Sequence, residues 1–201
     1  MLIRIKRYLQ GILDAGALHL VRLGVTPNLT SVFGLAASLV AAFFYLNMSY
    51  FPLLVWLGGL ALFASGMFDA LDGAMARLSN RSTPFGSFLD SLLDRYADAA
   101  IIFGISLGTP RDTTLLGLNI LAWGFIAMFG SITVSYLRAK AESLGISLSG
   151  VGLAERPERV AILIVSSMFL RPDIGVVAVA LLANVTVAER SLHVYKKLKA
   201  K

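Results

Sequence analysis

The sequence predicts an all-α integral membrane protein, with six transmembrane helices preceded by an N-terminal amphipathic interfacial helix. Hydrophobic residues make up 57% of the 201 residues and charged residues only 15%, whereas about a quarter of an average soluble domain is charged. The mean hydropathy is +0.76, so a soluble core of this size would not enclose all the apolar side chains. Long uncharged runs are separated by short basic segments, which is the pattern of a multi-pass protein.

The first segment, residues 1–22, mixes apolar and charged side chains in the manner of an amphipathic helix. Such a helix either lies in the membrane interface or packs as a first cytoplasmic helix against the others. Gly24 and Pro27 end it. We expect no signal peptide, because no compact apolar run with a small-residue cleavage site follows the basic start. The predicted division is a juxtamembrane helix over 1–22 and a six-helix domain over 23–201.

The predicted spans follow from uncharged runs of about 20 residues, the length that crosses a bilayer. Two spans fit between Arg22 and Asp69, where the sequence carries no charge. The short uncharged runs near the C-terminus place Arg159 and Arg190 below the cytoplasmic membrane surface, facing a wet cavity or snorkelling to the headgroups. The six spans are expected at residues 29–47, 52–70, 85–107, 114–139, 157–170 and 173–191.

The distribution of basic residues predicts the orientation of these spans. With both termini inside, fifteen of the eighteen Lys and Arg residues fall in cytoplasmic segments. Only Arg111 and Arg171 lie in outside turns, and Arg95 lies within a span. We therefore expect a multi-pass protein of the plasma membrane with its chemistry facing the cytoplasm. The net charge of +6 is explained by this topology, so no nucleic-acid partner is expected.

Four aspartates gather where the second and third expected spans meet. Asp69 and Asp72 are three residues apart, and Asp90 and Asp94 are four apart, so each pair shares one helix face. The segment 80–84 lets the two helices return antiparallel and brings the carboxylates together. Four anions in a low-dielectric pocket require a counter-charge, and oxygen ligands favour Mg²⁺ or Mn²⁺. The sequence has no cysteine and only two histidines, which argues against a thiolate or histidine centre.

These residues match a known signature. The pattern D-x-x-D-G-x-x-A-R, eight residues, G-x-x-x-D-x-x-x-D runs from Asp69 to Asp94 and is satisfied at every fixed position. On this motif the sequence resembles the CDP-alcohol phosphotransferase family. The resemblance implies a transferase of phospholipid biosynthesis, in which an acceptor alcohol attacks the β-phosphorus of a CDP-linked lipid and CMP leaves. It also implies a homodimer.

The resemblance implies a role for each motif residue. It makes Asp94 the general base of catalysis. It implies that two Mg²⁺ or Mn²⁺ ions are held by Asp69, Asp72, Asp90 and Asp94. It implies that the CDP-lipid is bound by Asp69, Asp72, Gly73, Ala76 and Arg77. Asp98 falls outside the motif, and we expect it either to have a structural role or to support the residues that contact the ligands.

Three arginines indicate the acceptor. The segments around Arg138, Arg159 and Arg190 resemble those of family members that make phosphatidylinositol phosphate or archaetidylinositol phosphate, where three basic residues bind the phosphate of inositol phosphate. The resemblance thus implies that CDP-diacylglycerol or CDP-archaeol and inositol 1-phosphate are the substrates. For Arg138 alone, the general excess of cytoplasmic positive charge explains the residue equally well.

Three other functions stay open from the sequence. The acceptor could be glycerol 3-phosphate, which is also phosphorylated, or the donor could be CDP-inositol. A protein of a different class, a cation transporter, could use the carboxylates as a midplane ion site. The expected position of the aspartates at helix ends, and the lack of an internal repeat, argue against the transporter.

Overall fold

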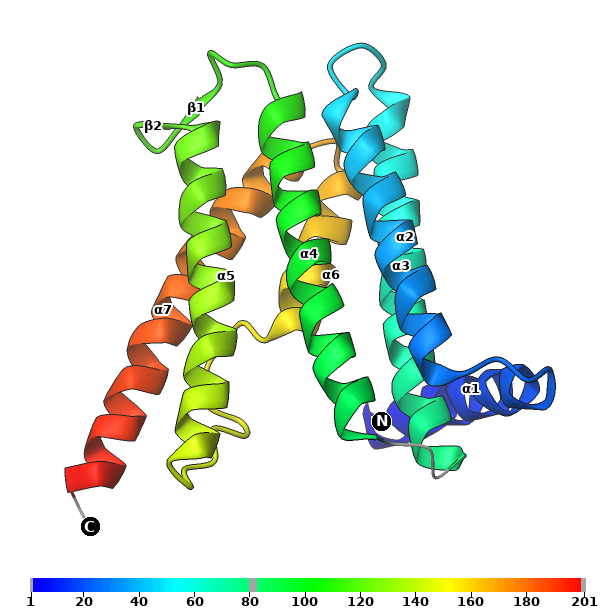
Figure 1. Cartoon of the computed structure of the whole chain (residues 1–201). Coiled ribbons are helices and arrows are strands. Elements are labelled where there is room, and N and C mark those ends of the chain that lie inside the picture. The colour runs from blue at the N-terminus through cyan, green and yellow to red at the C-terminus, as the bar shows by residue number, and fades with distance from the viewer. Residues whose placement is uncertain (1, 80–82, 200–201) are drawn as a thin grey trace.

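The computed structural model describes residues 2–79 and 83–199, and this part of the chain folds into helices and one small hairpin (Figure 1). The predicted reversal of the chain before Pro84 falls mostly outside the described residues. The helices are α1 (Leu2–Arg22), α2 (Pro27–Leu46), α3 (Leu53–Leu78), α4 (Pro84–Gly108), α5 (Ile120–Ser143), α6 (Arg156–Met168) and α7 (Pro172–Lys199). The hairpin consists of β1 (Thr114–Leu115) and β2 (Leu118–Asn119).

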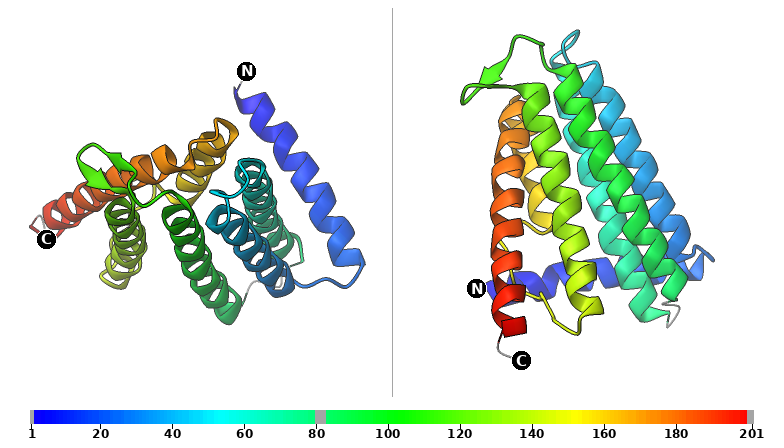
Figure 2. Two further views of the ribbon diagram at one scale, coloured as in Figure 1. Left: turned by 90° about the horizontal axis from the view of Figure 1, so that it is seen from above. Right: turned by 60° about the vertical axis from the view of Figure 1, so that its left-hand side comes forward.

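The helices form two groups that α6 joins. Seen from above in Figure 2, α2, α3 and α4 stand together, α5 stands beside α7, and α6 lies between α3 and α7. Small residues let the first group pack closely, since a Cβ added at Gly104 of α4 would lie 2.6 Å from the Ala42 carbonyl oxygen of α2. Tyr45 of α2 and Ser167 of α6 share a buried hydrogen bond of 2.7 Å, which ties α6 to this group.

The all-helical, membrane-spanning architecture is confirmed in its coarse form. Within the described residues, four helices are long and apolar enough to cross a membrane: α2, α3, α5 and α7. The expected third span corresponds to α4, which carries several aspartates along 25 residues. The expected fifth span corresponds to α6, whose 13 residues rise only about 20 Å at ~1.5 Å per residue.

The start predicted for the fourth span was wrong. Residues from Thr114 were expected to be helical, but α5 begins at Ile120 because the preceding six residues form the hairpin. Leu116 and Gly117 turn it with positive φ angles of 51° and 80°. Asn119 then caps α5 by accepting a hydrogen bond from the Leu121 backbone N–H at 2.8 Å. The leucines of the hairpin extend the apolar run, so hydropathy alone does not reveal this turn.

Helix α1 lies across the end of the bundle where α3 ends and α4 begins (Figure 1). Its Ala17 side chain is fully buried and packs with Ala74 and Met75 of α3. The first basic cluster, Arg4 to Arg7, belongs to the residues whose side chains are outside the described part. The packing on α3 positions α1 beside the end of the bundle that carries the aspartate motif.

Candidate active site

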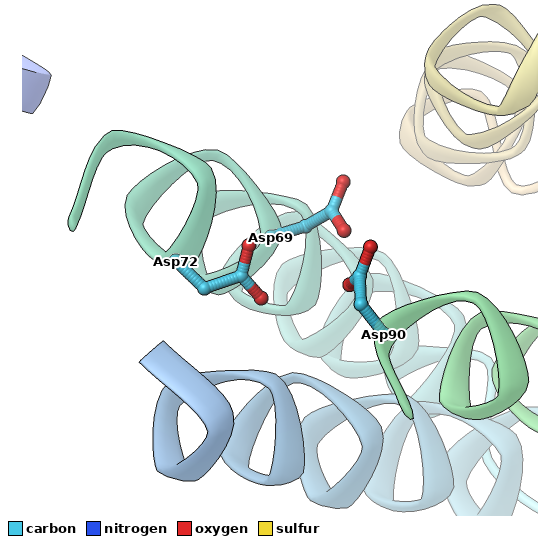
Figure 3. A group of neighbouring side chains, drawn as sticks. All are labelled: Asp69, Asp72 and Asp90. Carbon is cyan, nitrogen blue, oxygen red and sulfur yellow. The ribbon is translucent and has the colours of Figure 1, made fainter. Parts of the chain in front are cut away.

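Three of the predicted aspartates converge between α3 and α4. Carboxylate oxygens of Asp69, Asp72 and Asp90 all lie within 4.8 Å of one another, and Figure 3 shows the three side chains pointing toward a common space. Asp69 and Asp72 face the same side of α3 because they are one helical turn apart. Ser31 of α2 donates a 2.7 Å hydrogen bond to Asp72 Oδ2 and fixes that carboxylate. A set of three clustered carboxylates suits a hard divalent cation, so the donor set fits Mg²⁺ or Mn²⁺.

The fourth predicted aspartate, Asp94, lies one turn beyond Asp90 on α4 and forms ion pairs with arginines. Its Oδ1 is 2.9 Å from Nη1 of Arg156, and its Oδ2 is 3.4 Å from Nη2 of Arg95. The same Arg156 nitrogen is 2.8 Å from Asp69 Oδ1. A single guanidinium nitrogen thus connects Asp94 to the cluster of three carboxylates.

Asp98 continues this network one turn further along α4. Its Oδ1 is 3.3 Å from Arg156 Nε, and its Oδ2 is 3.0 Å from Arg159 Nη2. Asp98 therefore orients both arginines of α6, in keeping with the structural role expected for it. Arg156 lies outside the motif, and its spacing in the sequence does not predict a place in the site. One sequence feature does indicate where Arg156 lies. Proline is common in the first turn of a helix, so Pro157 predicts that a helix begins at Arg156.

The three arginines predicted for the acceptor phosphate differ in how firmly they are held. Arg190 is 1% exposed; it donates to the carbonyl oxygens of Val151 and Val134 and to Glu155 Oε1, each at 2.9 Å. These described contacts engage three of the five N–H donors of a guanidinium group. Arg159 is also buried and donates to the Ala154 carbonyl oxygen as well as to Asp98. Arg138 is exposed and pairs with Glu142 at 3.2 Å.

One cavity of about 830 Å³ joins the two predicted sets of residues. The carboxylates and the arginines both contribute to its wall, although they come from helices far apart in the sequence. Its charged lining includes Asp69, Asp72, Asp90, Asp94, Arg138, Arg156, Arg159 and Arg190. The structure therefore places the arginines and the aspartates on the wall of one cavity, with room for a substrate between them.

A second hollow of about 180 Å³ opens between α2 and the ends of α3 and α4. Asp72, Gly73 and Asp90 line both this hollow and the larger cavity. Ala76 also lines it, together with Asn28 and Ser31 of α2, two residues that were not assigned to the site from the sequence. Asn28 and Ser31 are three residues apart and so share a helix face, and this spacing is the sequence feature that links them.

Gly86 of the motif has a packing role at this hollow. A Cβ at this position would lie 2.9 Å from Asn28 Oδ1 and 3.1 Å from Thr83 Oγ1. The missing side chain therefore lets α4 begin close to α2. Gly73 differs, because a Cβ there would be 3.6 Å from Arg77 Nη1, an ordinary contact distance. The opening beside Gly73 is thus available to a ligand.

The sequence profile of the CDP-alcohol phosphatidyltransferases matches residues 24–192. The chain belongs to this family. The family predicted from the aspartate motif is therefore confirmed, and with it the activity of a metal-dependent CDP-alcohol phosphotransferase of phospholipid synthesis. The same match favours a transferase over the cation-transporter alternative.

Relatives that make inositol phospholipids resemble the chain over most of its length. It is 38% identical to the archaetidylinositol phosphate synthase of Pyrococcus horikoshii, over 89% of this chain and 88% of the relative. It is 40% identical to the phosphatidylinositol phosphate synthase of Mycobacteroides abscessus, over 85% of this chain and 78% of the relative.

Solved structures of one such synthase share the fold. The crystal structure of Mycobacterium tuberculosis phosphatidylinositol phosphate synthase with CDP-DAG bound matches with a TM-score of 0.76 and 28% identity, over 92% of this chain and 94% of that one. The same enzyme in complex with manganese and citrate also gives a TM-score of 0.76, over 91% and 88% of the two chains.

Proposed function

We propose that this enzyme transfers a phosphatidyl-type group from CDP-diacylglycerol or CDP-archaeol to inositol 1-phosphate and releases CMP. The observation that carries the proposal is the shared cavity, in which motif carboxylates and three arginines line one space. A phosphorylated acceptor needs an anion site beside the reacting centre, whereas an unphosphorylated alcohol does not. The names of the relatives, which are inositol phospholipid synthases, support the same acceptor.

In this mechanism Asp69, Asp72 and Asp90 hold the divalent cations, with Asp94 as a further ligand. Bound Mg²⁺ or Mn²⁺ would neutralise the negative charge of the pyrophosphate. Asp94 accepts the proton of the attacking hydroxyl group. The hydroxyl oxygen forms a bond to the β-phosphorus, and the bond from that phosphorus to the oxygen of CMP breaks. Two ions are proposed, since four carboxylates carry enough charge for both.

The two hollows suggest where the substrates bind. The smaller hollow, which Gly73 and Ala76 line, is proposed to take the cytidine diphosphate, with Arg77 completing the site. The larger cavity is proposed to take inositol phosphate, with its phosphate on Arg138, Arg159 and Arg190. The carboxylates common to both hollows would then lie between donor and acceptor, as an in-line displacement requires.

We propose that the chain crosses the plasma membrane six times. Both of its ends then lie in the cytoplasm. In this arrangement α4 and the short α6 cross with the four long apolar helices, and α1 lies in the interface. The basic residues at the end of α7 and beside the motif favour this orientation. The same proposal includes the division into a juxtamembrane helix over residues 1–22 and a six-helix domain over residues 23–201. It also includes a homodimer.

The acceptor is tested by CMP release from purified protein with Mn²⁺ or Mg²⁺. CDP-diacylglycerol and CDP-archaeol would be offered in parallel, each with inositol 1-phosphate, glycerol 3-phosphate, free inositol or serine. Release with inositol 1-phosphate alone is the expected result. Release with glycerol 3-phosphate instead would retain the reaction and contradict the proposed acceptor, and the preferred lipid would identify the donor.

A further inference from the structure

Arg156 lies inside the acidic cluster rather than beside it. Its Nη1 is 2.8 Å from Asp69 Oδ1 and 2.9 Å from Asp94 Oδ1, and its Nε is 3.3 Å from Asp98 Oδ1. The side chain is only 15% exposed. It reaches the cluster because α6 packs against α3, which brings the first residue of α6 to the carboxylates.

Arg156 contacts carboxylates that would bind a divalent cation. Asp69 belongs to the group of three carboxylates whose oxygens approach within 4.8 Å. An N–H donor and a divalent cation both bind carboxylate lone pairs, so each contact of Arg156 with Asp69 or Asp94 reduces what that carboxylate offers to an ion. A guanidinium group is always charged, and at this distance it also opposes a divalent cation electrostatically.

The other arginines around the cluster do not have this arrangement. Among the described carboxylates, Arg95 pairs only with Asp94, at 3.4 Å, and Arg159 pairs only with Asp98. Of the arginines in the described part of the chain, Arg156 alone forms ion pairs with two motif aspartates. It is also anchored by Asp98, whose second oxygen is held by Arg159. The guanidinium group can therefore leave the motif aspartates and still keep a carboxylate partner.

We propose that Arg156 is a resident counter-cation that competes with a divalent metal ion for Asp69 and Asp94. In the metal-free protein it balances their charge and holds α6 against α3 and α4. When an ion is bound by these carboxylates, Arg156 gives up Asp69 and Asp94 and keeps Asp98. The inference rests on the proposed function, in which these aspartates bind a divalent metal ion. The charge of the aspartates is then balanced both with and without the ion, by the metal or by Arg156.

The test measures Mn²⁺ binding without substrate, by calorimetric titration and by the electron paramagnetic resonance signal of free Mn²⁺. We expect Arg156→Gln to bind Mn²⁺ about tenfold more tightly than wild type, because a competing charge has been removed. In EDTA the same variant should unfold at a lower temperature than wild type. Added Mn²⁺ should then raise its unfolding temperature by more than it raises that of wild type.

Two further variants separate competition from a general loss of charge. Arg159→Gln removes the same charge from the same helix but contacts neither Asp69 nor Asp94, so its Mn²⁺ affinity should change by less than about threefold. Arg156→Lys keeps the charge but loses the fork that bridges two carboxylates. Its Mn²⁺ affinity should fall between those of wild type and Arg156→Gln.

Weaker or unchanged Mn²⁺ binding by Arg156→Gln would overturn the proposal, because Arg156 would then only position the carboxylates for the ion. If Arg156→Gln does not fold, Arg156→Lys decides in the same way: tighter binding than wild type supports competition, and equal or weaker binding contradicts it. If wild-type protein binds no Mn²⁺, the proposed metal site itself is wrong. This result is distinct from one in which wild type and Arg156→Gln both bind Mn²⁺ with equal affinity.

Discussion

Asp98 and Arg159 form a buried ion pair, in which Arg159 Nη2 lies 3.0 Å from Asp98 Oδ2 and the two side chains are 11% and 4% exposed. Asp98 is outside the family motif, yet it links an arginine of the proposed acceptor site to Arg156 and so to the motif aspartates. This single carboxylate therefore couples the two halves of the cavity.

Asp98→Asn should destabilise the protein and impair acceptor binding. Removing one partner of a buried ion pair leaves an uncompensated charge, at a cost of about 3–5 kcal/mol. We expect a lower unfolding temperature in detergent and a higher KM for inositol 1-phosphate, because Arg159 loses the group that orients it. Asp112→Asn, in the exposed turn before the hairpin, is the control and should change stability by no more than about 0.5 kcal/mol. Equal effects from both variants would contradict the role of Asp98.

Ser31→Ala tests the support of a metal-binding carboxylate. Ser31 donates the 2.7 Å hydrogen bond to Asp72 Oδ2, and a hydrogen bond to a charged group contributes about 1.5–3 kcal/mol. We expect weaker Mn²⁺ binding and a decrease in kcat/KM of about tenfold or more. Titration with Mn²⁺ and CMP-release kinetics measure the two effects.

The matched control for this variant is Ser38→Ala. Ser38 lies on the same helix and shares a buried 2.7 Å hydrogen bond with Ser65 of α3. Its loss should lower stability but leave Mn²⁺ affinity unchanged. A similar loss of Mn²⁺ affinity in both variants would show that Ser31 acts only by holding α2 against α3.

Arg138→Ala should raise the KM for inositol 1-phosphate with little effect on folding. The Arg138 side chain is 57% exposed and makes one described ion pair, with Glu142 on the same helix, and such exposed pairs contribute less than about 1 kcal/mol. Arg159→Gln should raise the same KM and also lower the unfolding temperature, because Arg159 is buried. The KM for the CDP-lipid should change little in either variant.

Lys140→Ala is the control, since Lys140 is exposed two residues further along α5 and is absent from the cavity wall. It should leave both KM values within about twofold of wild type. An acceptor KM that is unchanged in Arg138→Ala would remove Arg138 from the acceptor site and leave the cytoplasmic excess of positive charge as its explanation.

The carboxylate cluster was predictable from sequence because its geometry is local. Asp69 and Asp72, and likewise Asp90 and Asp94, share a helix face by spacing alone, and only an antiparallel return is needed to bring the pairs together. The position of Arg156 depends instead on how the chain between α5 and α6 returns to α3, which no periodic pattern encodes. Asp94 lines the same cavity as the other three aspartates, but its ion pairs with Arg156 and Arg95 have no counterpart in the spacing of the motif.

Helix boundaries were less predictable where apolar residues continue past a turn. The leucines of the hairpin prolong the hydropathy of α5, so the start of the fourth span was placed at residue 114 instead of 120. The turn depends on positive φ angles at Leu116 and Gly117, and only the glycine signals such a conformation in sequence. The aspartate motif was unaffected because its spacing does not depend on this turn.

Asp94→Asn should nearly abolish turnover and leave binding of the CDP-lipid largely intact. The amide keeps the shape of the side chain but does not accept the proton of the attacking hydroxyl group, and a general base contributes about 10²–10⁴-fold to the rate. Asp69, Asp72 and Asp90, whose oxygens lie within 4.8 Å of one another, remain in the variant and should still hold the metal and the pyrophosphate. Single-turnover CMP release measures the chemistry, and titration with CDP-diacylglycerol measures binding.

Asp72→Asn is the comparison, because it removes a member of the three-carboxylate group and should weaken both Mn²⁺ and CDP-lipid binding. Loss of CDP-lipid binding together with turnover in Asp94→Asn would count against the role of Asp94 as the base.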